Sequence, residues 1–233
     1  MMAVLLGALS ASAHDNDFTV NGICYRVNPD AHNACKVVHG HLSYSGHITI
    51  PSEVKYRGKT YQVVSIAERC FTGCKDIKSL DISSMTAIGE SAFAGCTGLK
   101  SVKLECFTSI GDNAFAGCTG LKEVSVSSVV HIGEGAFKGC TSLKKVKLSN
   151  ITQVDEYAFA QCPSLAAVEL RVITSVSPYA FYRCPSLRNV TLVNVTSVGE
   201  YAFAQCPSLR SVKVGSVTSY DDTAFDADVK LPR

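Results

Sequence analysis

The chain contains 233 residues, with 22 Lys and Arg against 20 Asp and Glu, so its formal net charge is only +2. Nucleic-acid-binding domains usually carry a strongly basic surface, and this charge balance argues against such a partner. Charged residues make up 18% and hydrophobic residues 46% of the sequence, which excludes a disordered polyelectrolyte and predicts a substantial buried core. No apolar run approaches the roughly 20 residues that span a bilayer, so we expect no transmembrane segment.

Residues 1–13 have the pattern of a secretory signal peptide. The apolar stretch from Ala3 to Leu9 leads to Ala11-Ser12-Ala13, a small-x-small pattern typical of a signal-peptidase site. The usual basic start is missing, because the first Lys or Arg is Arg26. We predict export with His14 as the first mature residue; the alternative is an apolar N-terminus without a targeting role.

Residues 14–47 are predicted to form a β-rich cap, because apolar and polar residues alternate between Phe18 and Val38. The next segment, residues 48–65, has the apolar spacing of a degenerate first repeat. A hairpin insertion around Tyr56-Arg57-Gly58-Lys59 interrupts it. Terminal units of stacked folds must be shielded, and we expect the cap to cover this first repeat.

From residue 66 to residue 233 the sequence repeats every 22 residues and ends in a partial repeat. Within one unit, Leu99, Val102 and Leu104 have L-x-x-L-x-L spacing and alternate with polar residues, which predicts a short strand with one buried face. Three locked columns carry the period: Phe71, Phe93, Phe115, Phe137, Phe159, Phe181, Phe203 and Phe225; Cys74, Cys96, Cys118, Cys140, Cys162, Cys184 and Cys206; and Leu99, Leu121, Leu143, Leu165, Leu187 and Leu209.

A short helical turn is predicted after each strand. The column with Gly89 and Asp155 has the composition of a helix N-cap, and the next column holds Glu90, Glu156 and Pro178, which suit the first helical position. A Pro follows the Cys in three repeats and prevents continuation. So short a turn does not persist alone, and we expect it to depend on stacking.

One 22-residue unit cannot bury its Leu, Phe and Cys, whereas units stacked about 4.8 Å apart share a strand ladder and a core. The predicted fold class is therefore α/β: a leucine-rich repeat solenoid with a parallel β ladder, one short helical turn per repeat and an N-terminal β cap. The repeat resembles the BspA-like, or Treponema-type, leucine-rich repeat family over residues 48–231, with the most specific match at Ile88–Cys96. The resemblance implies a secreted or surface-displayed protein of a bacterium or parasitic protist and, as for several members, an adhesin.

The cysteines favour packing over chemistry. The seven in the 22-residue column lack the short spacing of zinc ligands, and a ladder holds their Cβ atoms farther apart than a disulfide allows. We predict free buried thiols there and an unpaired thiol at Cys106. Cys24 and Cys35, on either side of a polar turn in the cap, are the candidate disulfide pair; the alternative is that both stay free.

Two exposed columns are candidate binding sites. Tyr157, Tyr179 and Tyr201, with Tyr182 nearby, either stabilise the stack or form a binding hot spot. A basic column either docks an anionic glycan or an acidic protein segment, or is a solvated edge. The outer strand face, small and polar, is a third candidate and suits a protein partner. The basic column consists of the residue after each core Leu: Lys78, Lys100, Lys122, Lys144, Arg188 and Arg210, interrupted by Ala166.

No enzyme motif appears: the sequence lacks G-x-S-x-G, H-E-x-x-H and a glycine-rich phosphate loop. His39 and His41 share a strand face, but nothing completes a metal site, so we expect neither metal nor cofactor. The predicted function is a non-catalytic secreted or cell-surface protein that binds an extracellular protein or anionic glycan, in host-matrix or cell–cell contact. The alternative is a structural spacer or self-associating surface protein.

Overall fold

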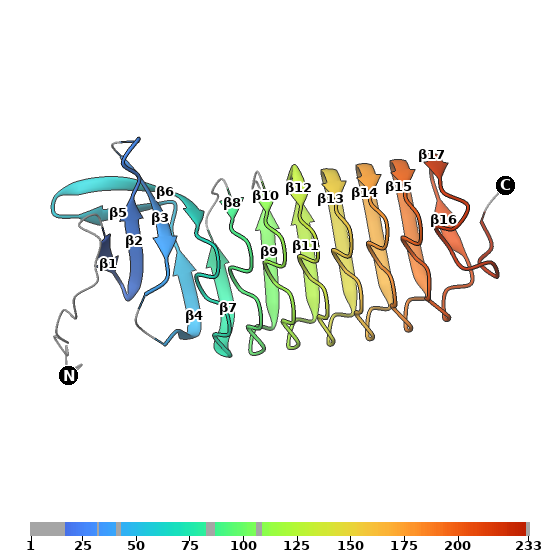
Figure 1. Cartoon of the computed structure of the whole chain (residues 1–233), viewed down its shortest axis with the longest axis horizontal. Helices are drawn as coiled ribbons and strands as arrows, with labels where there is room; N and C mark the ends of the chain where they lie inside the picture. The colour runs from blue at the N-terminus through green and yellow to red at the C-terminus, as the bar shows by residue number, and fades with distance from the viewer. Residues whose placement is uncertain (1–16, 32, 41–42, 83–86, 106–108, 232–233) are drawn as a thin grey trace.

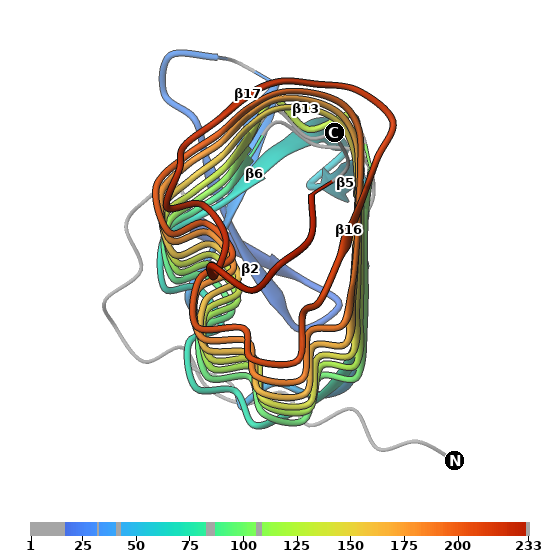
Figure 2. The ribbon, with the colours of Figure 1, turned by 90° about the vertical axis from the view of Figure 1, so that its right-hand side faces the viewer.

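The computed structural model describes residues 17–31, 33–40, 43–82, 87–105 and 109–231. The predicted signal peptide, His41 and Cys106 lie outside these residues. The chain winds into an elongated solenoid, with its coils stacked along one axis and a group of strands at the N-terminal end (Figure 1). Viewed along that axis, successive coils superpose on a common outline (Figure 2).

The N-terminal end is built from an antiparallel sheet and a hairpin. β1, β2 and β3 pair antiparallel in that order, and β3 continues the sheet by pairing parallel with β6 of the hairpin. The Phe18 ring stacks on Tyr56 at 4.5 Å and on Tyr25 at 5.5 Å between ring centroids, so the hairpin and the cap share an aromatic cluster. The strands are β1 (Asp17–Val20), β2 (Ile23–Val27), β3 (Ala34–Val38), β5 (Glu53–Tyr56) and β6 (Lys59–Ile66).

The remaining strands stack in parallel, and their register steps by one repeat. Val124 pairs with Val146, and Val146 pairs with Val168. This confirms the parallel ladder and the 22-residue repeat. The strands are β4 (Ser45–Ile50), β7 (Asp76–Ile82), β8 (Ala87–Ile88), β9 (Ser101–Glu105), β10 (Ser109–Ile110), β11 (Glu123–Ser127), β12 (His131–Ile132), β13 (Lys145–Val154), β14 (Ala167–Val176), β15 (Asn189–Val198), β16 (Val212–Val214) and β17 (Val217–Tyr220).

The predicted helical turn is wrong: the described residues contain no helix, and turns connect the strands instead. Backbone amides in these turns alternate between two partners. The Ala92 and Ala94 amides bond to carbonyls three residues earlier, whereas the Phe93 amide donates to Ala114 of the next coil at 2.8 Å. A left-handed residue, such as Ser91 with φ 52°, makes this alternation possible. A helix would satisfy its amides internally and break the ladder between coils.

The core is a continuous column of stacked phenylalanines. Consecutive rings from Phe71 to Phe225 lie 4.9 to 5.2 Å apart between centroids and within 7° of parallel. A tyrosine meets each end of the column edge-on: Tyr44 against Phe71 at 4.7 Å, and Tyr220 against Phe225 at 6.3 Å. Each ring therefore has an aromatic neighbour on both sides, including at the ends.

The predicted column of free thiols is confirmed from Cys96 to Cys206, where every member is fully buried; Cys74, the first member, is partly exposed. Each buried Sγ donates to the carbonyl oxygen of a phenylalanine 25 residues earlier, as Cys118 does to Phe93 at 3.2 Å. The thiol therefore acts as a small core side chain that also satisfies a backbone acceptor.

The candidate disulfide between Cys24 and Cys35 is wrong. The antiparallel register of β2 and β3 pairs Cys24 with Val38 and Cys35 with Val27. The two cysteines are therefore three positions, or about 10 Å, apart along the strand direction. A disulfide needs Cα atoms within about 7 Å, and both residues are free thiols.

Burial should make the core thiols unreactive in the folded protein. Desolvation raises the pKa of Cys118 and Cys162 to about 12, which lowers the thiolate fraction at pH 8 about a thousandfold relative to an ordinary thiol. We expect neither residue to react with a disulfide reagent before unfolding, and both to react in guanidinium chloride. Mass spectrometry of the labelled peptides would measure this, with partly exposed Cys24 as the internal comparison. Rapid native labelling of Cys118 would contradict the buried column.

Candidate functional site

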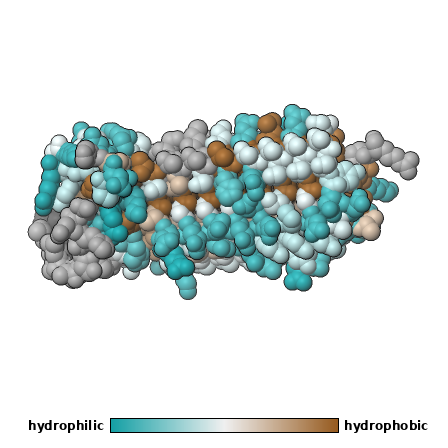
Figure 3. All heavy atoms as spheres, turned by 45° about the horizontal axis from the view of Figure 1, so that its top comes forward, coloured by the Kyte–Doolittle hydropathy of each residue, from teal (hydrophilic) through white to brown (hydrophobic). Residues whose placement is uncertain are grey.

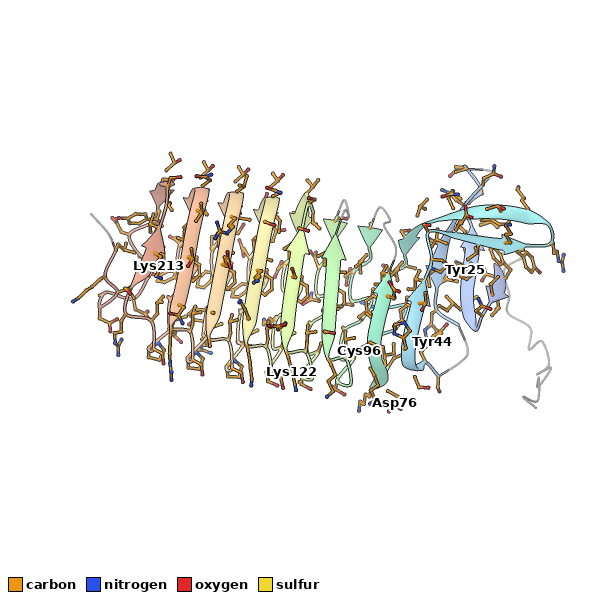
Figure 4. The ribbon with its side chains drawn as sticks, turned by 180° about the vertical axis from the view of Figure 1, so that it is seen from behind. Tyr25, Tyr44, Asp76, Cys96, Lys122 and Lys213 are labelled. Atoms are coloured by element: carbon orange, nitrogen blue, oxygen red, sulfur yellow. The ribbon has the colours of Figure 1, made fainter. Side chains whose placement is uncertain are left out.

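The structure places Lys78, Lys100, Lys122 and Lys144 in four successive coils, and we call these four residues the lysine strip. The amides of Lys100, Lys122 and Lys144 donate to the carbonyl oxygen of the strip residue in the preceding coil, at 3.2, 3.0 and 2.9 Å. This ladder fixes the four backbones in line, and all four side chains are exposed. Figure 4 shows Lys122 at the end of the sheet where the strands begin.

The lysine strip is not neutralised among the described residues, because none of the ion pairs there includes its ammonium groups. Two of its side chains reach over the next coil: the Lys78 Nζ lies 3.0 Å from the position that a Cβ would take at Gly98, and the Lys100 Nζ lies 3.4 Å from that position at Gly120. The missing side chain at Gly98 leaves room for the Lys78 stem. The strip is therefore a row of exposed cations held by a rigid backbone.

Beyond Lys144 the basic column is broken and partly paired. Ala166 carries no charge, and Arg188 is an exposed cation in the following coil. The last member, Arg210, donates to Asp228 at 2.5 Å. The basic column predicted from the sequence is therefore divided in two: the lysine strip, which forms no ion pair with another described residue, and a C-terminal continuation whose last cation is paired.

The outer face of the strands carries both signs of charge beside the strip, because Glu123 of β11 is in register with Lys145 of β13. Lys147 of β13 is paired in register with Glu169 of β14. Arg171 donates to the Glu169 carboxylate at 2.6 Å, and this hydrogen bond, with smaller contributions from Lys147 and Lys145, lowers the pKa of Glu169. Asp81 of β7 and Lys213 of β16 also lie on this face, so carboxylates and cations alternate along it rather than forming one basic region.

Tyr157, Tyr179 and Tyr201 form a stacked tyrosine column on the turn side. Their ring centroids lie 5.1 and 5.2 Å apart, and Tyr182 meets Tyr179 edge-on at 5.4 Å. All three occupy left-handed positions with φ between 52° and 59°. Desolvation, Tyr157 and Glu200 raise the pKa of the Tyr179 phenol. The predicted grouping of these tyrosines is confirmed.

A cavity of about 600 Å³, not predicted from the sequence, lies where the tyrosine column ends, beside Tyr201 and Asp222. His131, whose Nε2 lies 2.6 Å from Asp155 of the next coil, was not predicted either. His39 contacts the Cys70 carbonyl oxygen, and the described residues contain no group of three side chains able to hold a metal ion. Within the same residues, no helix has the length and hydropathy that a membrane crossing requires.

The repeats match a family model described as the BspA type leucine rich repeat region, over residues 47–166 and 108–231. A solved leucine-rich repeat protein of T. pallidum is 29% identical, with a TM-score of 0.69 over 79% of this chain and 86% of that one. Lower structural similarity is found to a leucine-rich cell surface protein of Faecalibacterium prausnitzii (19% identity, TM-score 0.33, covering 94% of this chain and 88% of that one). It is also found to the pneumococcal vaccine antigen PcpA (15% identity, TM-score 0.39, covering 92% of each chain). No curated protein matches this sequence.

Proposed function

We propose a function from the family to which this chain belongs, the BspA-type leucine-rich repeat family. It is a non-catalytic binding protein, secreted or displayed on the cell surface, that holds an extracellular protein or an anionic glycan in adhesive contact with host matrix or with other cells. The observation that carries the proposal is the lysine strip, because four exposed cations stand in successive coils without a carboxylate partner among the described residues.

The spacing of the strip suits a linear polyanion better than a small ligand. Neighbouring coils are about 4.8 Å apart, and four lysines in successive coils span three such spacings, or about 14 Å along the axis. One exposed ion pair contributes only about 0.2–1 kcal/mol, so useful affinity requires several contacts at once. Because the ladder already fixes the four backbones, binding does not have to order them.

Figure 3 shows the top of the molecule as drawn in Figure 1, whereas Lys122 lies at the bottom (Figure 4). Hydrophilic residues cover most of the face shown in Figure 3, and apolar residues appear there only as narrow, interrupted bands. Broad apolar patches usually mark hydrophobic docking sites, and this face has none among the described residues. Because the contact that we propose at the strip is ionic, we expect it to weaken strongly as salt is added.

Replacing Lys100, Lys122 and Lys144 together by Glu should abolish retention on a heparin column at low salt. The matched control replaces Lys36, Lys55 and Lys59 of the N-terminal strands by Glu, which changes the net charge equally but leaves the strip intact. The control variant should elute at nearly the wild-type salt concentration. Equal loss in both variants, or a wild-type protein that flows through at low salt, would refute the strip as the binding surface.

Self-association is the second candidate, favoured by the last coil. Among the described residues, β17 pairs only with β15, so one edge of this strand has no strand partner. Exposed strand edges promote pairing between chains. Light scattering over a hundredfold range of protein concentration distinguishes the two functions. A molar mass that stays at the monomer value would exclude self-association and favour the binding function.

A further inference from the structure

The two ends of the tyrosine column differ. At the N-terminal end, the Lys138 ammonium lies 5.2 Å above the Tyr157 ring centroid and covers its outer face. At the other end, the next coil has Thr223 in the column position, and its side chain is too short to cover the Tyr201 ring. Tyr201 remains 38% exposed. Among the described residues, one end of the column is therefore covered by a cation and the other end is open.

The open face is a wall of the cavity of about 600 Å³, which we call the tyrosine pocket; Tyr179, Tyr182, Tyr201, Gln205, Asp222 and Asp226 line it. The pocket lies between the tyrosine column and the final coil, at the C-terminal end of the solenoid. Tyr179 and Tyr182 meet at 89°, so the ligand space has aromatic walls in two orientations.

Two carboxylates line the pocket. Asp222 is exposed on its rim. The Asp226 carboxylate accepts the backbone amides of Gln205 and Cys206 at 2.9 Å each, which fixes a second negative charge in the wall. Cations are attracted to aromatic faces, and nearby carboxylates add to that attraction.

Arg183 shows how a guanidinium is bound on this surface. Its guanidinium lies 5.2 Å from the Tyr182 ring centroid, and its Nε donates to the Gln205 side-chain oxygen at 2.8 Å. Lys138 and Arg183 thus cover two of the exposed tyrosine faces with basic side chains of the chain itself. The Tyr201 face, with Asp222 beside it, offers the same kind of site, and no side chain of the described residues places a cation on it.

We propose that the tyrosine pocket binds an arginine side chain of a partner protein. The guanidinium stacks on Tyr201 and donates to the Asp222 carboxylate, as its planar fork of donors allows. This site has the opposite charge to the lysine strip. The proposal deepens the proposed function, because it names the side chain through which a protein partner would bind. It rests on that function in one respect, namely that the partner is a protein.

The test compares two peptides of the same shape: acetyl-Gly-Arg-Gly-amide and its analogue with citrulline, which is nearly isosteric with arginine but neutral. Each is titrated into full-length protein carrying ¹³C-labelled tyrosine rings, and the NMR shifts are followed. The arginine peptide should shift the Tyr201 and Tyr182 resonances saturably, and the citrulline peptide should bind at least fivefold more weakly. Asp222→Asn should weaken arginine binding at least fivefold. The matched control, Asp228→Asn in the same coil but outside the pocket, should not.

Equal affinity for both peptides would overturn the proposal, because the pocket would then not select a cation. Equal loss in the Asp222 and Asp228 variants would overturn it as well, since only general charge would matter. The result is independent of the heparin experiment. Arginine binding without heparin retention refutes the strip alone, whereas heparin retention without tyrosine shifts refutes the pocket alone.

Discussion

Phe137→Ala is expected to destabilise the protein by about 3–5 kcal/mol, a large part of the roughly 5–15 kcal/mol that holds a typical domain together. The Phe137 ring is fully buried and stacks on Phe115 at 5.1 Å and on Phe159 at 4.9 Å. Removing it opens a cavity between two coils, and the ladder on either side prevents the coils from collapsing into it. Urea denaturation followed by circular dichroism would measure the loss.

Phe225→Ala is the comparison that tests the one-dimensional stack. Phe225 lies in the last coil, where Phe203 stacks on one side at 5.1 Å and Tyr220 makes only an edge contact at 6.3 Å. Its side is also more open, with 9% of the residue exposed. In a stack of nearest neighbours an end coil contributes less, so the loss should be clearly smaller. Equal losses for the two variants would contradict this organisation.

The repeat explains why much of the fold was predictable. The spacing of Phe, Cys and Leu shows which residues occupy equivalent positions, and the alternation around Val102 and Leu104 shows which face of the strand is buried. Stacking follows because no single unit can bury those residues alone. The lysine strip was predictable for the same reason. Equivalent positions of stacked repeats lie one above another, so a residue type that recurs at one position of the repeat forms a line.

The turn was not predictable from composition. Gly, Asp, Glu and Pro at Gly89, Asp155, Glu90 and Pro178 have the chemistry of a helix start, but they also suit tight turns. The choice between a helix and a turn depends on hydrogen bonds from every second amide to the next coil. Such bonds join two repeats, so the sequence of one repeat does not reveal them. The cysteine pair failed likewise, because the register of β2 and β3 depends on their turn rather than on either cysteine.

The tyrosine pocket lies where the column of tyrosines ends. A search for repeats identifies residues that recur, and it does not identify a site where a residue type stops recurring. Thr223 follows Tyr201 by one repeat, and Ala204 follows Tyr182. Each of these two large rings is thus followed by a small side chain in the coil after its own. These substitutions were visible in the sequence, but their consequence required the relative positions of the two columns, which the structure supplies.

Deleting one whole repeat should leave a folded, shorter solenoid. Removal of residues 145–166 joins Lys144 to Ala167, which then takes the register position of Lys145 against Glu123. Phe181 would stack on Phe137 in the place of Phe159. Every buried side chain would still pack against the same residue types as before. The far-ultraviolet circular dichroism per residue should be unchanged, with a modest drop in the urea midpoint.

Deleting half a repeat, residues 145–155, should instead unfold the C-terminal coils. Lys144 would then join Glu156, leaving a coil without its strand, and the chain could not complete the circuit that brings Phe159 beneath Phe137. The contact between the coils before and after the deletion would be lost, which divides the solenoid into two stacks. Neither of the two new ends would be shielded by a cap. Native labelling of Cys184 and Cys206, fully buried in the intact chain, would report this directly. If the whole-repeat deletion exposed these thiols equally, the coils would not be interchangeable units, and the stacking that explains both core and strip would fail.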